Sequence, residues 1–140
     1  MTHPIYPCLW FDGKAKEAAD FYCSVFPNSL ITSENHLVVM FESLGQKFML
    51  LNGGPHYTLN PSISFVVNCD TQEEIDYYWG KLSAVPEAEQ CGWLVDQFGV
   101  SWQIVPTILG ELMSDPSRSQ RTINAFMQMK KFDIEKLLQA

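Results

Sequence analysis

The chain has few basic residues and no long hydrophobic run. Its 140 residues include 9 Lys and Arg against 16 Asp and Glu, so the formal net charge is −7. Such a surface repels phosphate backbones and anionic lipid heads, and we expect neither nucleic acid nor a membrane as a partner. No apolar stretch approaches the roughly 20 residues that a spanning helix needs, and the first residues lack a secretory-signal pattern. We therefore expect a cytoplasmic protein.

Cysteine pairs and histidine motifs are also missing. The four cysteines are far apart and form no Cys-x-x-Cys pair, so we expect small apolar core residues in a reducing compartment: Cys8, Cys23, Cys69 and Cys91. The three histidines show no ligand spacing such as His-x-x-x-His. Only His56, in the loop after Gly54-Pro55, is a candidate for the mouth of a pocket. The sequence therefore indicates neither a disulfide framework nor a histidine-based metal motif.

Hydrophobic residues make up 46% of the chain, which is ample for the core of one domain spanning residues 1–140. Apolar spacing and turn residues divide the first part into a strand, a helix and three more strands. The expected segments are Pro7–Phe11, Lys14–Phe26, Ser29–Glu34, Leu37–Glu42 and Gln46–Leu51.

The same order then begins again. Ser62–Cys69 predicts a strand, and Thr71 with Glu74 predicts the capping box of a helix. That helix has an apolar face of Ile75, Tyr78, Trp79 and Leu82. Two more strands are expected at Trp93–Val95 and Ser101–Val105, and Asp96 is interpreted as a turn carboxylate before Gly99.

The second part matches the first in two places. Lys16–Tyr22 aligns with Gln72–Tyr78, and Gly45–Leu51 aligns with Gly99–Val105 at nearly the same offset. Two matches in the same order indicate duplicated βαβββ units. We therefore expect an α+β fold in which two βαβββ repeats form a curved mixed or antiparallel sheet around a cleft, with extra C-terminal helices. The expected bounds are 5–54, 60–106 and, for the helical tail, 107–140.

The segment Gly92–Pro106 contains a specific motif at about Trp93 to Pro106, and four further parts of the chain are characteristic: Phe21–Ser29, Asn52–Pro55, Asn60–Phe65 and parts of the tail from Asp115 to Ile134. With these segments the chain resembles, from about Ile5 to Ala140, PhnB-like proteins of the glyoxalase/bleomycin-resistance superfamily, also called the vicinal-oxygen-chelate superfamily. Members of this branch are often labelled 3-demethylubiquinone-9 3-methyltransferases. The residues do not favour methyl transfer, because no glycine-rich strand-to-helix loop is present and Gly53-Gly54 reads as a turn.

The resemblance implies a homodimer and four positions at which metal-dependent relatives carry His or Glu ligands. In this chain those positions fall at Pro7 or Cys8, Met49, Ser64 and Gln103. None is a histidine or a carboxylate, so we expect no metal and no cofactor. Ser64 and Gln103 are interpreted as a hydrogen-bonding pair on a cavity floor, which either binds a ligand or satisfies itself.

We therefore expect a pocket for an unidentified small molecule, and its candidate residues are Phe11, Met49, Asn52, Ser64, Trp102 and Gln103. Trp10 and Trp93 are further candidates for aromatic walls, with plain core packing as the alternative. The sequence names no catalytic residue. Three functions stay open: a metal-independent protein that binds its ligand, with or without transforming it, a sequestering drug-resistance-like protein, and a metal-dependent lyase, isomerase or dioxygenase, which the missing ligands disfavour.

The tail carries an apolar stripe of its own. Asp115-Pro116-Ser117 predicts a helix cap, and the stripe consists of Ile123, Phe126, Met127, Met129 and Phe132. Such a stripe docks either on its own domain or across a dimer seam. The resemblance favours the dimer.

Overall fold

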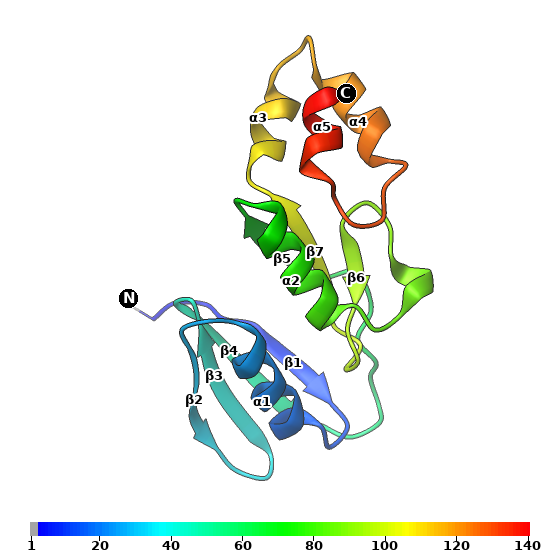
Figure 1. Ribbon diagram of the computed structural model, residues 1–140. Helices are drawn as coiled ribbons and strands as arrows, with labels where there is room; N and C mark the ends of the chain where they lie inside the picture. The colour runs from blue at the N-terminus through cyan, green and yellow to red at the C-terminus, as the bar shows by residue number, and fades with distance from the viewer. Residues whose placement is uncertain (1–2) are drawn as a thin grey trace. The chain divides into compact units, whose positions relative to one another are not determined.

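The computed structural model describes residues 3–140 and divides into two compact units, which meet in sequence between Leu59 and Asn60. Each unit contains a mixed sheet and a helix that follows its first strand, and the second unit continues into three C-terminal helices (Figure 1). The predicted α+β fold with two βαβββ-like modules and a helical tail is therefore confirmed.

The first unit follows the expected segments to within one residue at each end. It consists of β1 (Cys8–Phe11), α1 (Ala15–Val25), β2 (Ser29–Glu34), β3 (Val38–Ser43) and β4 (Gln46–Asn52). The strand order is β1-β4-β3-β2, with β1 parallel to β4 and the other neighbours antiparallel.

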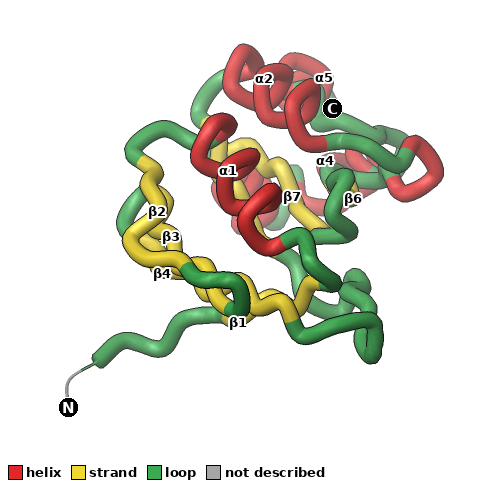
Figure 2. The backbone as a smooth tube through the Cα atoms, turned by 90° about the horizontal axis from the view of Figure 1, so that it is seen from below, coloured by secondary structure: helices red, strands yellow, loops and turns green. Residues whose placement is uncertain are grey.

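The core of the first unit lies between α1 and one face of this sheet (Figure 2). The helix buries a stripe at helical spacing, Ala15, Ala18, Ala19, Tyr22 and Val25, while alternate strand residues face it. Phe41 stacks between Tyr22 and Phe48, with ring centroids 5.9 and 4.9 Å apart. The core is therefore filled by the apolar residues whose helical spacing in α1 and alternation in the strands predicted these elements.

The second unit contains β5 (Phe65–Cys69), α2 (Gln72–Leu82), the short 3-10 helix η1 (Pro86–Ala88), β6 (Trp93–Val95) and β7 (Ser101–Pro106). The strand order is β5-β7-β6, with β5 parallel to β7 and β6 antiparallel to it. The expected start of β5 at Ser62 is wrong by three residues, because the Ser62 amide donates to Asn60 Oδ1 (2.8 Å) in a turn.

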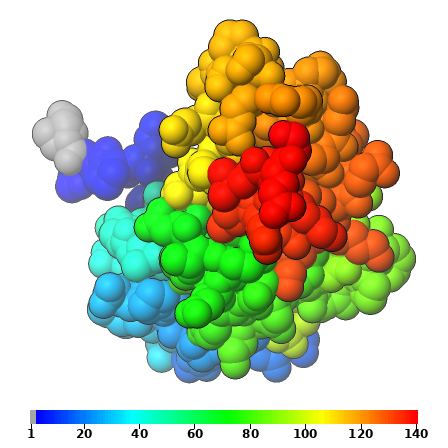
Figure 3. Space-filling model, turned by 45° about the horizontal axis from the view of Figure 1, so that its top comes forward, coloured from blue at the N-terminus to red at the C-terminus, as the bar shows by residue number. Residues whose placement is uncertain are grey.

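The tail forms α3 (Ile108–Ser114), α4 (Ser119–Phe126) and α5 (Ile134–Gln139), and it packs on its own unit. Lys131 pairs with Asp76 of α2 at 2.7 Å, and the C-terminal segment lies against α2 in Figure 3. The apolar stripe therefore docks on the domain that carries it, which is the first of the two alternatives that the sequence left open. Within residues 3–140, no helix is long and apolar enough to cross a membrane.

Candidate functional site

Each sheet has one face covered by its helix and one face that the helix leaves open. In the first unit Met49 of β4 lies opposite Cys8 of β1, and in the second unit Gln103 of β7 lies opposite Val66 of β5. Met49 and Gln103 are both partly exposed, whereas their strand neighbours on the helix side are buried. The two residues therefore occupy equivalent positions on the open faces, as the internal repeat predicts.

Ser64 and Gln103 are hydrogen-bonded to each other. The Gln103 side-chain amide donates to Ser64 Oγ at 2.9 Å, although Ser64 lies just before β5 rather than inside it. The predicted pair is therefore formed. The bond occupies one of the two amide hydrogens of Gln103 and leaves its carbonyl oxygen available to another donor.

A pocket of about 700 Å³ lies on the open face of the second sheet, a volume in the range of small-molecule sites. Its floor is formed by alternate residues of β6 and β7, namely Trp93, Val95, Ser101, Gln103 and Val105. The tail forms the opposite wall with Leu109, Phe126, Met127 and Phe132. Residues far apart in sequence therefore line one largely apolar pocket within a single unit.

Ser101 is the unusual polar group of this pocket. The residue is only 2% exposed, and within the described residues its hydroxyl oxygen is buried without a hydrogen-bond partner. Ser101 and Gln103 are two residues apart on β7, so their side chains lie on the same face of the strand. Buried polar groups are almost always hydrogen-bonded, and an unpaired one in a pocket indicates a place for a ligand atom.

Cys91 forms part of the pocket wall and has a left-handed backbone, with φ of +51°. Its amide donates to the carbonyl of Met129 at 2.8 Å, and the next amide, of Gly92, donates to that of Lys130 at 2.7 Å. The Cys91 sulfur lies 3.8 Å from the Met127 sulfur. These two backbone hydrogen bonds therefore connect the tail to the residues just before β6, whose side chains form part of the pocket floor.

The expectation that all four cysteines are core residues is wrong for three of them. Cys69 is buried, and this burial raises the pKa of its thiol to about 11. Cys8 is exposed, because it lies on the open face of an edge strand, while Cys23 and Cys91 are partly exposed. All four are free thiols.

Three predicted pocket residues lie on the helix-covered faces and do not line the pocket of the second unit. Phe11 is 4% exposed in the first core. Asn52 Oδ1 accepts the Ala15 amide at 2.9 Å and so caps α1. Trp102 is 5% exposed and donates its indole N–H to Asp96 Oδ2 at 2.8 Å.

Asp96 is the turn carboxylate that the sequence predicts, and its burial adds a second role. Oδ1 accepts the amides of Phe98 (2.8 Å) and Val100 (3.0 Å), while Oδ2 holds Trp102. Ser101 was not among the pocket residues predicted from the sequence. The alternation of β7 around Gln103 was the signal that could have found it.

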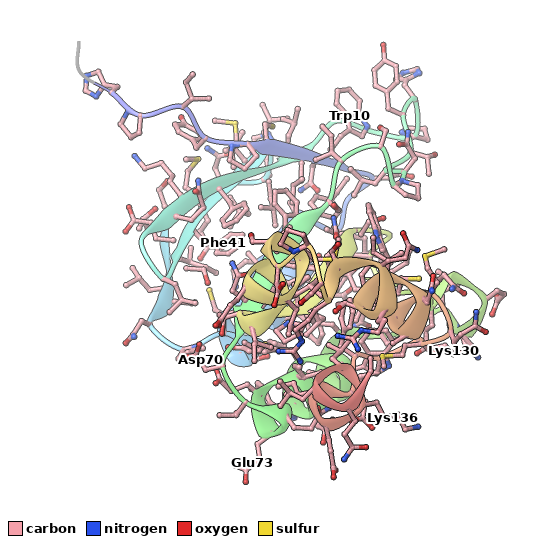
Figure 4. The ribbon with its side chains drawn as sticks, turned by 90° about the horizontal axis from the view of Figure 1, so that it is seen from above. Trp10, Phe41, Asp70, Glu73, Lys130 and Lys136 are labelled. Carbon is pink, nitrogen blue, oxygen red and sulfur yellow. The ribbon has the colours of Figure 1, made fainter. Side chains whose placement is uncertain are left out.

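Trp10, whose side chain is labelled in Figure 4, contacts the Gly53-Gly54 loop. The Trp10 ring lies so close to Gly53 that a β-carbon there would overlap it, and its N–H donates to the carbonyl of Gly54 at 2.8 Å. Tyr57 contacts the same ring edge-on, with centroids 4.9 Å apart. Gly53 therefore leaves room for this ring, whereas Gly54 has open space beside it and a left-handed backbone with φ of +98°.

The side chains at the family's metal positions do not supply the donors that such a metal needs. Cys8 and Met49 face each other in one unit, and Ser64 bonds to Gln103 in the other, so the four provide a thiol, a thioether, a hydroxyl and an amide. In the part of the chain from residue 3 onward, no group of three or more His, Cys, Asp or Glu is placed to hold a metal ion. This set does not match the His and carboxylate sites of zinc, nickel or iron.

Comparison with known proteins identifies one family. The family model for 3-demethylubiquinone-9 3-methyltransferase matches residues 3–105. The match ends before α3, so the expected resemblance of the tail lies outside it. No curated protein matches the chain.

Three solved structures illustrate the likeness. The PhnB protein from Bacillus cereus is 34% identical with a TM-score of 0.64, and the match covers 75% of this chain and 100% of that one. A Pseudomonas aeruginosa protein is 16% identical with a TM-score of 0.57, with coverages of 75% and 98%. The fosfomycin resistance protein FosX from Listeria monocytogenes, in complex with Mn(II) and sulfate, is 12% identical with a TM-score of 0.57, with coverages of 81% and 97%. The last two show a shared fold alone.

Proposed function

The chain belongs to the 3-demethylubiquinone-9 3-methyltransferase family, in its PhnB-like branch with the vicinal-oxygen-chelate fold, and on this premise we propose that it binds an apolar small molecule in the pocket of its second unit without a metal ion. The observation that carries the proposal is the buried, unpartnered hydroxyl of Ser101 in the described part of an otherwise apolar pocket of about 700 Å³. Gln103, held by Ser64, supports it as a second polar group.

A thermal-shift screen of apolar and aromatic metabolites tests the binding function. A ligand that fills the pocket raises the melting temperature, because it stabilises the folded state alone. Gln103→Ala weakens binding of any such ligand, while Gln46→Ala, an exposed glutamine at the start of β4 in the other unit, leaves it unchanged. Equal affinity in the two variants would place the ligand elsewhere.

Elemental analysis tests metal independence. We expect substoichiometric zinc, nickel, manganese and iron in the purified protein, and no change in melting temperature with a chelator. Turnover that requires an added divalent ion and stops with the chelator would instead establish the metal-dependent alternative.

Catalysis is a separate question from binding. Ligand stabilisation with no product formed favours the sequestering function, and product formation without metal favours a metal-independent enzyme. The expected homodimer stays a prediction, which size-exclusion chromatography with light scattering tests.

A further inference from the structure

We propose that the pocket of the second unit selects uncharged ring compounds that carry a hydroxyl or carbonyl oxygen, with that oxygen bound by Ser101. This inference rests on the proposed binding function and names the class of ligand. It has two parts, the exclusion of charge and the polar anchor.

The exclusion of charge follows from the lining. Among the described residues that form the pocket, none is Asp, Glu, Lys, Arg or His. A charged ligand group would lose its hydration here without gaining an opposite charge, which disfavours its binding. A neutral ligand avoids this cost.

Two carboxylates next to the lining are directed elsewhere. The carboxylate of Asp96, adjacent to Val95, accepts hydrogen bonds from Phe98, Val100 and Trp102. Glu89, adjacent to Gln90, accepts the Trp79 indole N–H at 3.1 Å and the Ser83 hydroxyl at 2.6 Å. Neither carboxylate is placed to balance a ligand cation inside the pocket.

The polar anchor follows from Ser101. A buried hydroxyl without a hydrogen-bond partner destabilises the unliganded protein, and a ligand oxygen that bonds to it removes this cost. The aromatic rings of Trp93, Phe126 and Phe132 form walls that suit a flat apolar body. A ring compound with one oxygen therefore satisfies both features at once.

Three naphthalene probes test the proposal at pH 7: 2-naphthol, naphthalene and 2-naphthoate. They share one ring system and differ in carrying a neutral oxygen, no oxygen or a charged carboxylate. The readout is the rate of alkylation of Cys91, which lines the pocket, measured by peptide mass spectrometry over a range of probe concentrations. The exposed Cys8 of the other unit is the internal reference.

We expect 2-naphthol to protect Cys91 at concentrations about tenfold lower than 2-naphthoate and several-fold lower than naphthalene. Ser101→Ala should reduce protection by 2-naphthol to the level of naphthalene and leave naphthalene unchanged. Ser43→Ala, a matched change at a buried strand serine of the first unit, should alter neither.

The outcomes separate the two proposals. Equal protection of Cys91 by 2-naphthoate and 2-naphthol would overturn the selection of neutral ligands while leaving the binding function in place. An unchanged 2-naphthol response in Ser101→Ala would overturn the anchor. Failure of all three probes to protect Cys91 would overturn the binding function as well.

Discussion

Asp96 is a buried carboxylate that organises the turn between β6 and β7. It is 1% exposed, and its two oxygens accept hydrogen bonds from the backbone amides of Phe98 and Val100 and from the indole of Trp102. Hydrogen bonds to a charged acceptor contribute about 1.5–3 kcal/mol each. One side chain therefore joins a local turn to the core of the second unit.

Asp96→Asn should lower the free energy of unfolding by roughly 2–4 kcal/mol, because the new NH₂ group must face either the backbone amides or the indole N–H, all of which are donors. Urea unfolding followed by tryptophan fluorescence measures the loss. Asp20→Asn, which changes an exposed carboxylate paired with Lys16, should cost less than about 1 kcal/mol. Similar losses in both variants would contradict the role of Asp96.

Two buried serines should respond in opposite directions to removal of the hydroxyl. Ser101→Ala should leave the melting temperature unchanged or raise it, because this hydroxyl has no partner among the described residues. Ser43→Ala should lower it, because Ser43 bonds to Ser29 at 2.8 Å. Differential scanning calorimetry measures both. A marked loss in Ser101→Ala would mean that this hydroxyl is satisfied in solution.

At the scale of elements, the two connecting helices begin by different means. Thr71 caps α2 locally, since its hydroxyl accepts the Glu74 amide at 3.2 Å, while Glu74 accepts the Asp70 amide at 3.3 Å. Lys14 at the start of α1 makes no such bond, and Asn52 at the end of β4 takes that role. The first cap is readable in the sequence as a capping box, and the second is not.

Asn52→Ala should destabilise the protein by about 1–2 kcal/mol, because it removes the acceptor for the Ala15 amide and the donor to the carbonyl of His36. Thr71→Ala should cost about 1 kcal/mol through the local cap alone. Chemical denaturation of both variants checks the comparison. A neutral Asn52→Ala would show that the α1 terminus is satisfied without it.

Gln72 connects α2 to the tail on both sides of one residue, Asp133. Its amide donates to the carbonyl of Phe132 at 2.9 Å, and its carbonyl accepts the amide of Ile134 at 2.8 Å. Gln72→Ala should therefore increase hydrogen exchange at Ile134 and its neighbours well before the strands exchange. Gln120→Ala, at an exposed glutamine of α4, is the control. Unaltered exchange at Ile134 would contradict this account.

At the scale of the whole molecule, the tail completes a pocket that the matched family region only begins. The family match ends at residue 105, whereas Leu109, Phe126, Met127 and Phe132 of the pocket lie beyond it. Phe132 also fills the space beside Gly92, where a β-carbon would overlap its ring. The proposed binding pocket therefore includes residues outside the matched region.

Docking of the tail should depend on pH through Asp76. The hydrogen bond from Lys131, with a second from Gln72, holds the pKa of Asp76 below its ordinary value. The contact therefore contributes above the unfolded pKa of about 4 and is lost as the pH falls through the folded value. Urea midpoints of the native protein and Asp76→Asn should differ at pH 6 and approach each other as the pH falls below about 4. A difference that persists at low pH would contradict the ion pair as its cause.

Local patterns predicted much of the fold. Strand alternation and helical apolar spacing located the elements of the first unit to within one residue, and Thr71 and Asp96 were identified because a cap and a turn need partners only a few residues away. The start of β5 was misplaced, since Asn60 Oδ1 accepts the Ser62 amide in a turn and the strand begins only after this turn. Phe11, Asn52 and Trp102 were named as pocket residues because the sequence shows alternation but not which face a helix covers.

The sequence by itself determined the two repeats and the bond-forming pair Ser64 and Gln103. The tertiary structure decided that Asn52 caps α1, that Gln72 holds the tail, and that Ser101 faces an apolar pocket. These contacts join residues tens of positions apart, as the Gln72 to Ile134 bond shows. Their formation depends on how whole elements pack against each other, and short-range spacing carries no information on that packing.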